Sequence, residues 1–264
     1  MIFRITASVA LAALVYAGAS RAGTCQGRPE ALGTARVIAL DPSEHRKLGL
    51  MEYNETLPLE DHEVVLTFDD GPIPPATPKV LDALAAECVK ATFFVVGQMA
   101  KAHPELVRRE FQEGHTVGTH TEHHPNLNRL PAEAATREIT AGIASVNKAL
   151  GEPLAAPFFR FPYLEPKATQ DALALKLGLT IWSTDIHASD WDPLSPAQVA
   201  ELAMRRLERS KKGILMLHDI HQRTALAVPL LLRELKARGY RAVQVVPADA
   251  AHPKTAASAE MWTD

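Results

Sequence analysis

The segment TFDDGP at residues 67–72 constrains this chain more than any other part of its sequence. It continues the apolar residues 64–66 and ends in Gly-Pro, a pattern typical of a buried strand that stops in a sharp turn. Two carboxylates, Asp69 and Asp70, would then lie together at the end of a buried strand. Such carboxylates need a cation, a proton or water nearby. The segment therefore predicts a site in which one carboxylate binds a metal ion and the other acts as a base.

The first 22 residues have the pattern of a secretory signal peptide. Arg4 supplies a positive charge, residues 5–19 are apolar and small, and small residues precede the expected cleavage after Ala22. An uncleaved anchor helix is the alternative, although the apolar stretch falls short of the roughly 20 residues that a membrane span needs. We therefore expect an exported protein, periplasmic or secreted, with no membrane span after cleavage.

The two cysteines, Cys25 and Cys88, are consistent with export. In an oxidising compartment they could form one disulfide. Alternatively, Cys88 is simply a buried small apolar residue. Cys25 also lies close enough to the cleavage site for lipidation, but Gly23 and Thr24 make a poor lipidation signal.

From residue 63 onward, apolar segments alternate with amphipathic ones, a pattern typical of βα units and a mostly parallel sheet. We expect strands at residues 64–68, 92–96, 115–118, 157–161, 179–184, 213–217 and 240–246. We expect helices at residues 78–88, 104–113, 132–150, 167–177, 196–210 and 225–238. This order favours an α/β fold, a distorted or incomplete (β/α) barrel of about seven units, with a doubly wound open sheet as the alternative.

The expected barrel domain lies at residues 63–249, and its length suits one domain of this kind. An irregular leader at residues 23–62 precedes it, and a loose tail at residues 250–264 follows it. The net charge of −3 provides no basic surface for nucleic acid, so we expect no nucleic-acid partner. We expect a monomer. In a barrel, functional groups should lie at the carboxyl ends of the strands.

His120 and His124 follow the third expected strand. Their i,i+4 spacing puts both on one side of a helical turn, and imidazole is a usual ligand of divalent cations such as zinc. Two histidines and one carboxylate form a recurrent catalytic zinc set, which leaves positions for water and substrate. Cobalt or nickel would be accepted by the same donors. His120 with His123 is a weaker alternative pairing.

Further polar side chains follow the later strands. Arg160 could pair with one of the strand-end carboxylates and lower its pKa, or it could form an ordinary salt bridge at the rim. His218 is a natural general acid if an aspartate holds it, although a lone histidine is more often structural. Four other polar residues near these positions are interpreted as a solvated rim without a role: Glu122, His123, Asp219 and His221.

Taken together, these residues resemble the polysaccharide deacetylases, the NodB-homology domains grouped as carbohydrate esterase family four. The five motifs of that family occur in order: TFDDG at 67–71, HTxxHP at 120–125, RxPY at 160–163, Asp-Trp at 190–191 and Leu-His at 217–218. They span roughly residues 63 to 246. The joint match is highly specific, although each motif alone is not.

The resemblance implies a role for each of these residues. Asp70, His120 and His124 would hold the metal, most readily zinc. Asp69 would be the general base that deprotonates water, and Arg160 would position it.

The remaining roles concern the other side of the cleft. The backbone N–H of Tyr163 would help to stabilise the oxyanion. His218, held by Asp190, would protonate the leaving amine. The substrate pocket would include Trp191, Leu217 and Pro162, the first two beside the acetyl methyl group.

One departure from the family pattern affects this assignment. The fourth motif usually reads Asp-x-x-Asp-Trp, whereas Asp185 and Asp190 are five residues apart here. We favour Asp190 as the partner of His218 because it retains the adjacent Trp191.

The resemblance implies a metal-dependent hydrolase that removes acetyl groups from N-acetylated amino-sugar polymers or oligomers. Peptidoglycan, chitin-like chains and poly-N-acetylglucosamine are the polymers considered. The alternatives are an O-acetyl esterase that acts on xylan-like glycans and a non-catalytic glycan-binding protein. The intact Asp69, Arg160 and His218 argue against the second alternative, since a pure binding protein needs none of them.

Overall fold

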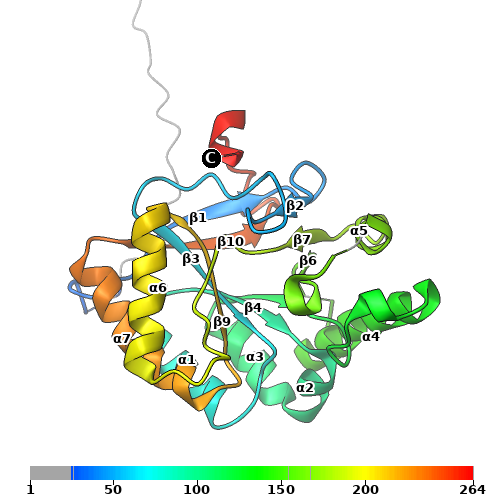
Figure 1. Ribbon diagram of the computed structural model, residues 1–264, viewed down its shortest axis with the longest axis horizontal. Coiled ribbons are helices and arrows are strands. Elements are labelled where there is room, and N and C mark those ends of the chain that lie inside the picture. Colours follow the sequence, from blue (N-terminus) through cyan, green and yellow to red (C-terminus); the bar gives the residue numbers. More distant parts are fainter. Residues whose placement is uncertain (1–24, 26, 154, 167, 264) are drawn as a thin grey trace, which may run out of the picture.

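The computed structural model describes residues 25, 27–153, 155–166 and 168–263. The expected signal peptide, residues 1–22, therefore lies outside the described residues. Parallel strands form a twisted central sheet, and helices pack around its outer side (Figure 1). None of the helices in the described part of the chain has the length and apolar character of a membrane span.

Strands and helices alternate along most of the chain, as the sequence pattern predicts. The strands are β1 (Thr34–Leu40), β2 (Lys47–Leu48), β3 (Glu63–Asp69), β4 (Thr92–Val95), β5 (Thr116–Thr119), β6 (Phe158–Phe159), β7 (Thr180–Trp182), β8 (Ile186–His187), β9 (Gly213–His218) and β10 (Arg241–Pro247). The α-helices are α1 (Ala76–Ala86), α2 (Gly97–Ala102), α3 (Pro104–Gln112), α4 (Ala132–Leu150), α5 (Ala168–Lys176), α6 (Pro196–Ser210) and α7 (Gln222–Ala237). The short 3₁₀ helices are η1 (Leu127–Arg129), η2 (Pro162–Leu164) and η3 (Ala259–Trp262).

The described strands form one parallel sheet that curls into an incomplete barrel. Its order runs β1-β10-β3-β4-β5-β6-β7-β2, and β9 pairs with both β3 and β8. β7 pairs with β6 on one side and β2 on the other, and no pairing joins β2 to β8 among the described strands, so the barrel is open between β2 and β8. The predicted α/β fold with an incomplete barrel is confirmed.

β3 is the central strand of the barrel. It pairs with β10 at its start, with β4 at its end and with β9 along its length. Leu66 and Phe68 pack in the core beneath the helices, whereas Val65 belongs to the inner core. Because successive side chains of a strand point to opposite faces, Asp69 shares the inner face with Val65. The strand thus delivers Asp69 to the interior of the barrel at its carboxyl end.

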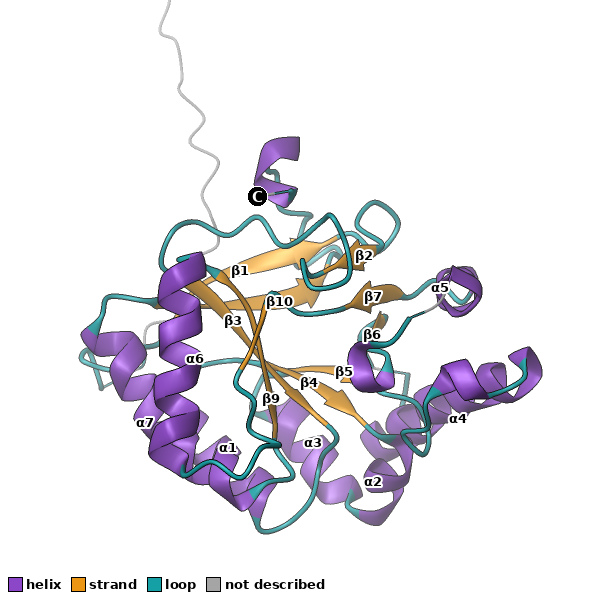
Figure 2. Ribbon diagram, viewed as in Figure 1, coloured by secondary structure: helices purple, strands orange, loops and turns teal. Residues whose placement is uncertain are grey.

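Local residue types explain where the helices begin and end. α6 begins after Ser195, whose side chain and backbone exchange hydrogen bonds with Gln198 in a capping box, and Pro196 occupies the first helical position. α4 ends at Gly151, whose φ of 91° is a left-handed conformation that favours glycine. Figure 2 shows α1, α6 and α7 packed together along one part of the sheet and α2, α3 and α4 along another.

The segments on either side of the barrel are more ordered than expected. Residues 23–62, predicted to be an irregular leader, contain β1 and β2, which pair with β10 and β7. The middle of β1 is only half-buried, so its sequence shows a weak strand pattern. The tail, predicted to be loose, contains Trp262, which is buried and stacks on His45 with 3.3 Å between ring centroids.

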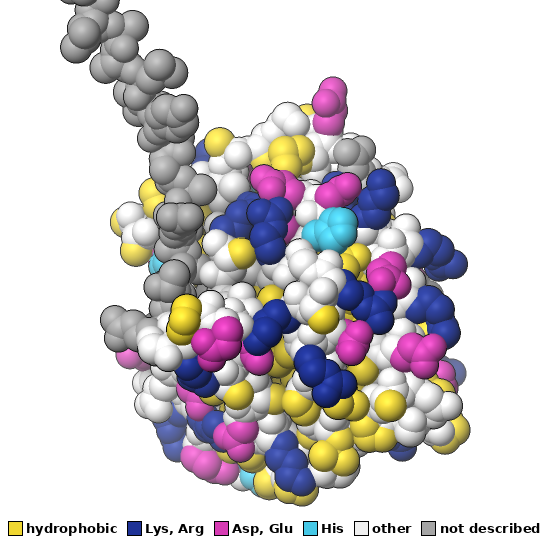
Figure 3. Space-filling model, turned by 90° about the vertical axis from the view of Figure 1, so that its left-hand side faces the viewer, with side chains coloured by type: hydrophobic (Ala, Val, Ile, Leu, Met, Phe, Trp, Pro, Cys, Tyr) yellow, Lys and Arg dark blue, Asp and Glu magenta, His cyan; other side chains and the backbone are white. Residues whose placement is uncertain are grey.

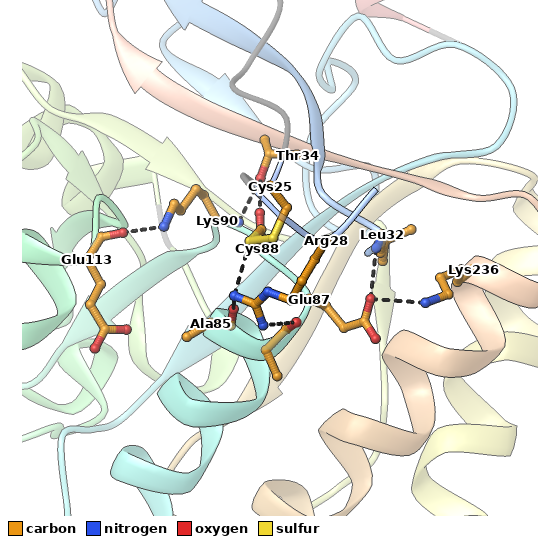
Figure 4. Close-up of a disulfide and its surroundings, with 11 residues drawn as sticks. Cys25, Arg28, Leu32, Thr34, Ala85, Glu87, Cys88, Lys90, Glu113 and Lys236 are labelled. Atoms are coloured by element: carbon orange, nitrogen blue, oxygen red, sulfur yellow. Dashed lines mark hydrogen bonds and ion pairs between the residues drawn. A yellow bond between two sulfur atoms is a disulfide. The ribbon is translucent and has the colours of Figure 1, made fainter. Parts of the chain in front are cut away.

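Cys25 and Cys88 form a disulfide, which decides between the two interpretations of Cys88. Hydrogen bonds also hold the N-terminal segment in place beside the disulfide (Figure 4). Arg28 donates hydrogen bonds to the last carbonyl groups of α1, and Glu87 accepts one from the Leu32 backbone N–H. The carbonyl groups at a helix end have no partner within the helix, so the hydrogen bonds from Arg28 also cap the C-terminal end of α1.

Charged side chains of both signs are interspersed on the face of the molecule shown in Figure 3. Polyanions such as nucleic acids bind where Lys and Arg side chains gather on one surface. On this face the basic side chains alternate with acidic ones, in line with the small net charge of −3.

Candidate active site

The carboxyl ends of the strands surround a cavity of about 690 Å³. Side chains that the sequence predicts as functional line it together: Asp69, Asp70, His120, His124, Tyr163, Trp191 and His218. They come from β3, β9 and the loops that follow β5, β6 and β8. This edge of the sheet is where a (β/α) barrel carries its functional groups.

The three predicted metal ligands lie next to one another. Asp70 Oδ1 is 3.4 Å from His120 Nε2 and 3.2 Å from His124 Nε2. Ligand atoms about 2.1 Å from a divalent ion, at angles of about 90–110°, lie roughly 3.0–3.4 Å apart, so this spacing suits a metal. His123, the alternative partner of His120, is exposed and pairs with Glu138 instead.

The surroundings of these ligands also suit a cation. His120 Nδ1 lies 2.7 Å from the Arg160 carbonyl oxygen, so Nδ1 carries the proton and Nε2 turns a lone pair toward Asp70. Asp70 Oδ1 is buried without a hydrogen-bond partner among the described residues, which is costly unless a cation binds there. A carboxylate oxygen and two imidazole nitrogens are donors that zinc, cobalt or nickel accept.

A buried ion pair fixes Asp69. Arg160 Nη1 donates a hydrogen bond of 2.6 Å to Asp69 Oδ1, and both side chains are buried. The same guanidinium donates to the Thr67 hydroxyl and to the Ser183 carbonyl, and it lies 4.2 Å from the centre of the Phe94 ring. Burial lowers the pKa of Arg160, while the Asp69 charge opposes that effect. The guanidinium therefore stays charged and holds one Asp69 oxygen in a single orientation.

Asp190 holds His218 within the same cavity. Asp190 Oδ1 lies 2.8 Å from His218 Nδ1, and Asp190 Oδ2 accepts hydrogen bonds from the His218 backbone N–H and the Thr224 hydroxyl. Burial lowers the pKa of His218, but Asp190 outweighs burial and raises this pKa to about 9. The imidazole is therefore a cation at neutral pH, with a proton on Nε2.

Asp185, the other aspartate of the fourth motif, makes different contacts. It accepts hydrogen bonds from the Leu50 backbone N–H and from the Thr56 hydroxyl, at the open side of the barrel. Asp190 is the residue that contacts His218, as the adjacent tryptophan suggests. The two aspartates, which are more widely spaced than in the family pattern, thus have separate contacts, and those of Asp185 are structural.

Trp191 and Tyr163 lie at the mouth of the cavity, where both are partly exposed. The Trp191 ring makes a T-shaped contact with His218, and the Tyr163 ring makes one with His124. Tyr163 has a φ of 64°, which is uncommon for a bulky residue and is found chiefly where function or packing imposes it.

Two residues predicted in the pocket lie outside its lining. Leu217 is buried in the core between β9 and the helices, because successive residues of β9 point to opposite faces. Met216, one position earlier, lines the cavity in its place. Pro162 is buried at the start of η2, whereas Phe161 and Tyr163 on either side of it line the cavity.

Asp219, interpreted from the sequence as part of a solvated rim, is buried. It accepts hydrogen bonds from the Gly71 backbone N–H and the Thr77 hydroxyl, and burial raises its pKa to about 7. A Cβ at position 71 would lie 2.1 Å from an Asp219 oxygen, so glycine is required there. Asp219 therefore holds the turn that follows Asp70. Glu122, interpreted from the sequence as part of the same rim, is buried as well.

The cavity is also lined by side chains for which the sequence predicts no role. His187 stacks on Trp191 with 4.9 Å between ring centroids, and Met51 and Glu52 come from the segment after β2. No local motif marks these residues, because only the folded sheet brings them to the site.

Comparison with known proteins agrees with this arrangement. A family model described as polysaccharide deacetylase matches residues 57–182. The peptidoglycan-N-acetylglucosamine deacetylase PgdA of Listeria monocytogenes is 35% identical over 184 residues, which cover 69% of this chain and 38% of that protein. A peptidoglycan-N-acetylglucosamine deacetylase of Bacillus cereus is 33% identical over 195 residues, which cover 72% of this chain and 89% of that protein. This chain thus spans well under half the length of the Listeria protein but most of the Bacillus one.

The fold is similar to that of solved deacetylases. A peptidoglycan deacetylase of Bdellovibrio bacteriovorus superposes with a TM-score of 0.72 at 30% identity, covering 83% of this chain and 61% of that one. Sequence and fold thus lead to the same conclusion. This chain belongs to the polysaccharide deacetylase family.

Proposed function

We propose that this protein is a metal-dependent deacetylase that removes acetyl groups from N-acetylated amino-sugar polymers or oligomers. The observation that carries the proposal is one cavity that contains three side chains suited to hold a metal ion, a carboxylate fixed by Arg160 and a histidine held by Asp190. Among the candidate polymers we favour peptidoglycan, because the Listeria and Bacillus relatives are named as peptidoglycan-N-acetylglucosamine deacetylases.

Asp70, His120 and His124 would hold the metal ion. When bound, the ion supplies a Lewis acid that polarises the acetyl carbonyl and makes a water molecule more acidic. The backbone N–H of Tyr163 would add a hydrogen bond to the oxygen that becomes negative. Trp191 and Met216 would enclose the acetyl methyl group, since both line the cavity.

Asp69 would take a proton from the attacking water. The water oxygen then forms a bond to the acetyl carbon, and the carbonyl oxygen becomes negatively charged. Arg160 serves this step by holding the base in place through a charged hydrogen bond. General-base catalysis of this kind contributes roughly 10²- to 10⁴-fold to the rate.

His218 would donate its Nε2 proton to the leaving nitrogen while the carbon–nitrogen bond breaks. An amine is a poor leaving group, so the bond breaks only when the nitrogen receives a proton. Asp190 keeps the imidazole charged and sets its orientation. The products are acetate and a free amine on the glycan.

The proposal includes export of the protein, with residues 1–22 as the signal peptide and residues 63–249 as the catalytic domain. The Cys25–Cys88 disulfide supports an oxidising compartment. The peptidoglycan named for the relatives is an extracytoplasmic polymer, which also supports export.

Acetate release tests the proposed function. The purified protein is loaded with zinc, the bound metal is quantified, and acetate is measured with peptidoglycan, N-acetylglucosamine oligomers and acetylxylan. We expect release from the N-acetylated glycans and little from acetylxylan. Absence of release from every N-acetylated glycan, with zinc demonstrably bound, would falsify the proposal. Release from acetylxylan alone would favour the esterase alternative.

A further inference from the structure

The loop that contains His120 and His124 belongs to no helix or strand. Its backbone has left-handed φ angles at Thr121 (65°) and His124 (57°), which are uncommon for residues other than glycine. Such a conformation costs free energy and persists only where the surrounding structure holds it. The two imidazoles therefore come together only because neighbouring groups fix the backbone of this loop.

Two helices pack directly against the backbone of the loop. At the start of α2, the Gly97 N–H donates a hydrogen bond of 2.9 Å to the Thr121 carbonyl. The first N–H groups of a helix have no partner within it, so the loop also satisfies the start of α2. α4 approaches equally closely, because a Cβ at Gly142 would lie 2.5 Å from the Thr121 carbonyl carbon. Both α2 and α4 thus support the loop between its two histidines.

The Glu122 side chain links the loop to the same two helices. Glu122 Oε1 forms an ion pair with Lys101 Nζ of α2, and Glu122 Oε2 accepts a hydrogen bond of 2.8 Å from the Ser145 hydroxyl of α4. Only 3% of the Glu122 side chain is exposed. A buried carboxylate is costly without partners, so the carboxylate stays where both of these groups reach it. One side chain therefore joins the middle of the loop to α2 and to α4.

We propose that Glu122 is a positioning residue for the metal site. Its carboxylate fixes the loop backbone, and the fixed backbone sets the positions of the His120 and His124 imidazoles. Their Nε2 atoms lie 3.4 and 3.2 Å from Asp70 Oδ1. This inference rests on the proposed function, in which these three side chains hold the metal ion. Residues that orient metal ligands from outside the ligand set typically change metal affinity 10- to 100-fold when they are substituted.

Zinc affinity, measured by competition with a chromogenic chelator, tests this role. Glu122→Ala removes both contacts of the carboxylate, so its affinity should fall about 10- to 100-fold. Glu122→Gln keeps the length of the side chain and can still form hydrogen bonds with Lys101 and Ser145, so its affinity should stay within threefold of wild type. Glu133→Ala, which changes an exposed glutamate on α4, is the matched control and should equal wild type. An affinity of Glu122→Ala within threefold of wild type would overturn the proposal.

Cobalt reports the arrangement of the ligands themselves. The visible absorption of bound cobalt depends on the number and geometry of its ligands, so the spectrum of Glu122→Ala should differ from that of wild type. The spectra of Glu122→Gln and Glu133→Ala should match wild type, which a general loss of stability in Glu122→Ala would not explain. Superimposable spectra for Glu122→Ala and wild type would contradict the positioning role.

A second variant keeps the proposal testable if thermal melting shows that Glu122→Ala does not fold. Lys101→Met removes the ion pair from the partner's side, and the Lys101 side chain is 59% exposed. Its zinc affinity should fall at least threefold, whereas Lys79→Met, an exposed change on α1, should have no effect. A zinc affinity of Lys101→Met equal to that of Lys79→Met would count against Glu122.

These measurements separate the role of Glu122 from the proposed function, because none of them needs a substrate. If no glycan is deacetylated but Glu122→Ala binds zinc more weakly than Glu122→Gln, only the proposed function fails. If wild type releases acetate and Glu122→Ala binds zinc as wild type does, the proposed function stands and Glu122 does not position the metal ligands. Absence of zinc binding by the wild-type protein would overturn both.

Discussion

Asp69 and His218 are partners in register across the pairing of β3 with β9. Side chains of registered residues on neighbouring parallel strands point to the same face of the sheet. The proposed base and the proposed acid therefore face the same cavity because of strand pairing, without a loop to position either. A second contact between the strand ends, the Asp219 backbone N–H to the Asp69 carbonyl at 3.3 Å, continues this pairing by one residue.

Asp69→Asn should abolish turnover without loss of metal. The amide keeps the shape of the carboxylate but cannot take a proton from water, so we expect kcat to fall about 10²- to 10⁴-fold. Zinc affinity, measured by competition with a chromogenic chelator, should stay within threefold of wild type. Asp61→Asn, on the exposed surface, serves as the control and should retain full activity. An active Asp69→Asn enzyme would show that another group is the base.

His124→Ala should weaken metal binding, whereas His123→Ala should not. His124 Nε2 lies 3.2 Å from Asp70 Oδ1, while His123 is exposed and pairs with Glu138. Loss of one of three protein ligands should lower zinc affinity by at least 100-fold, while His123→Ala should match wild type. A chelator should abolish activity, and added zinc or cobalt should restore it. Equal metal affinity in the two variants would rule out the assigned ligand set.

Asp190→Asn should move the alkaline limit of activity to lower pH. His218 acts as an acid only while protonated, and Asp190 raises its pKa to about 9 against the opposing effect of burial. Wild-type kcat should therefore hold up to about pH 9 and fall above it. Without the aspartate charge, burial lowers the pKa of His218, so the fall in kcat should begin at least one pH unit earlier.

The pH profile of Asp192→Asn is the comparison for this experiment. Asp192 is exposed and lies two residues from Asp190 in the same loop. Its profile should follow that of the wild type. Superimposable profiles for wild type and Asp190→Asn would mean that His218 does not supply the proton.

Removal of the disulfide should reduce stability more than activity. Cys25 and Cys88 are 63 residues apart in sequence, and a link across a loop of that length stabilises a protein by about 2–4 kcal/mol. In urea denaturation, the Cys25→Ser, Cys88→Ser double variant should show a lower free energy of unfolding by about that amount. Its kcat at low temperature should equal that of wild type, because the disulfide lies at the end of α1, away from the cavity. An unchanged unfolding midpoint would contradict the expectation.

Patterns among residues that are close in the sequence predicted much of the fold and part of the candidate site. The turn after β3 and the cap at Ser195 each involve residues within a few positions of one another. The chemistry of such groups depends mainly on local backbone geometry, so it can be recognised in the sequence. The barrel strands can also be recognised in the sequence, because a strand buried on both faces needs a continuous apolar run. The helical turn expected for His120 and His124 is wrong, because an irregular loop with left-handed φ angles at Thr121 (65°) and His124 (57°) brings the two imidazoles together.

The sequence by itself therefore determined the βα order, the three candidate metal ligands and the paired acids at the end of β3. Only the tertiary structure decided that Met216 rather than Leu217 lines the cavity, because strand alternation and register set which face a side chain takes. It also decided that Asp219 is buried against Gly71 and that Asp185 attaches the segment after β2. These contacts join residues more than a hundred positions apart, and their energy exists only once the sheet has brought the segments together.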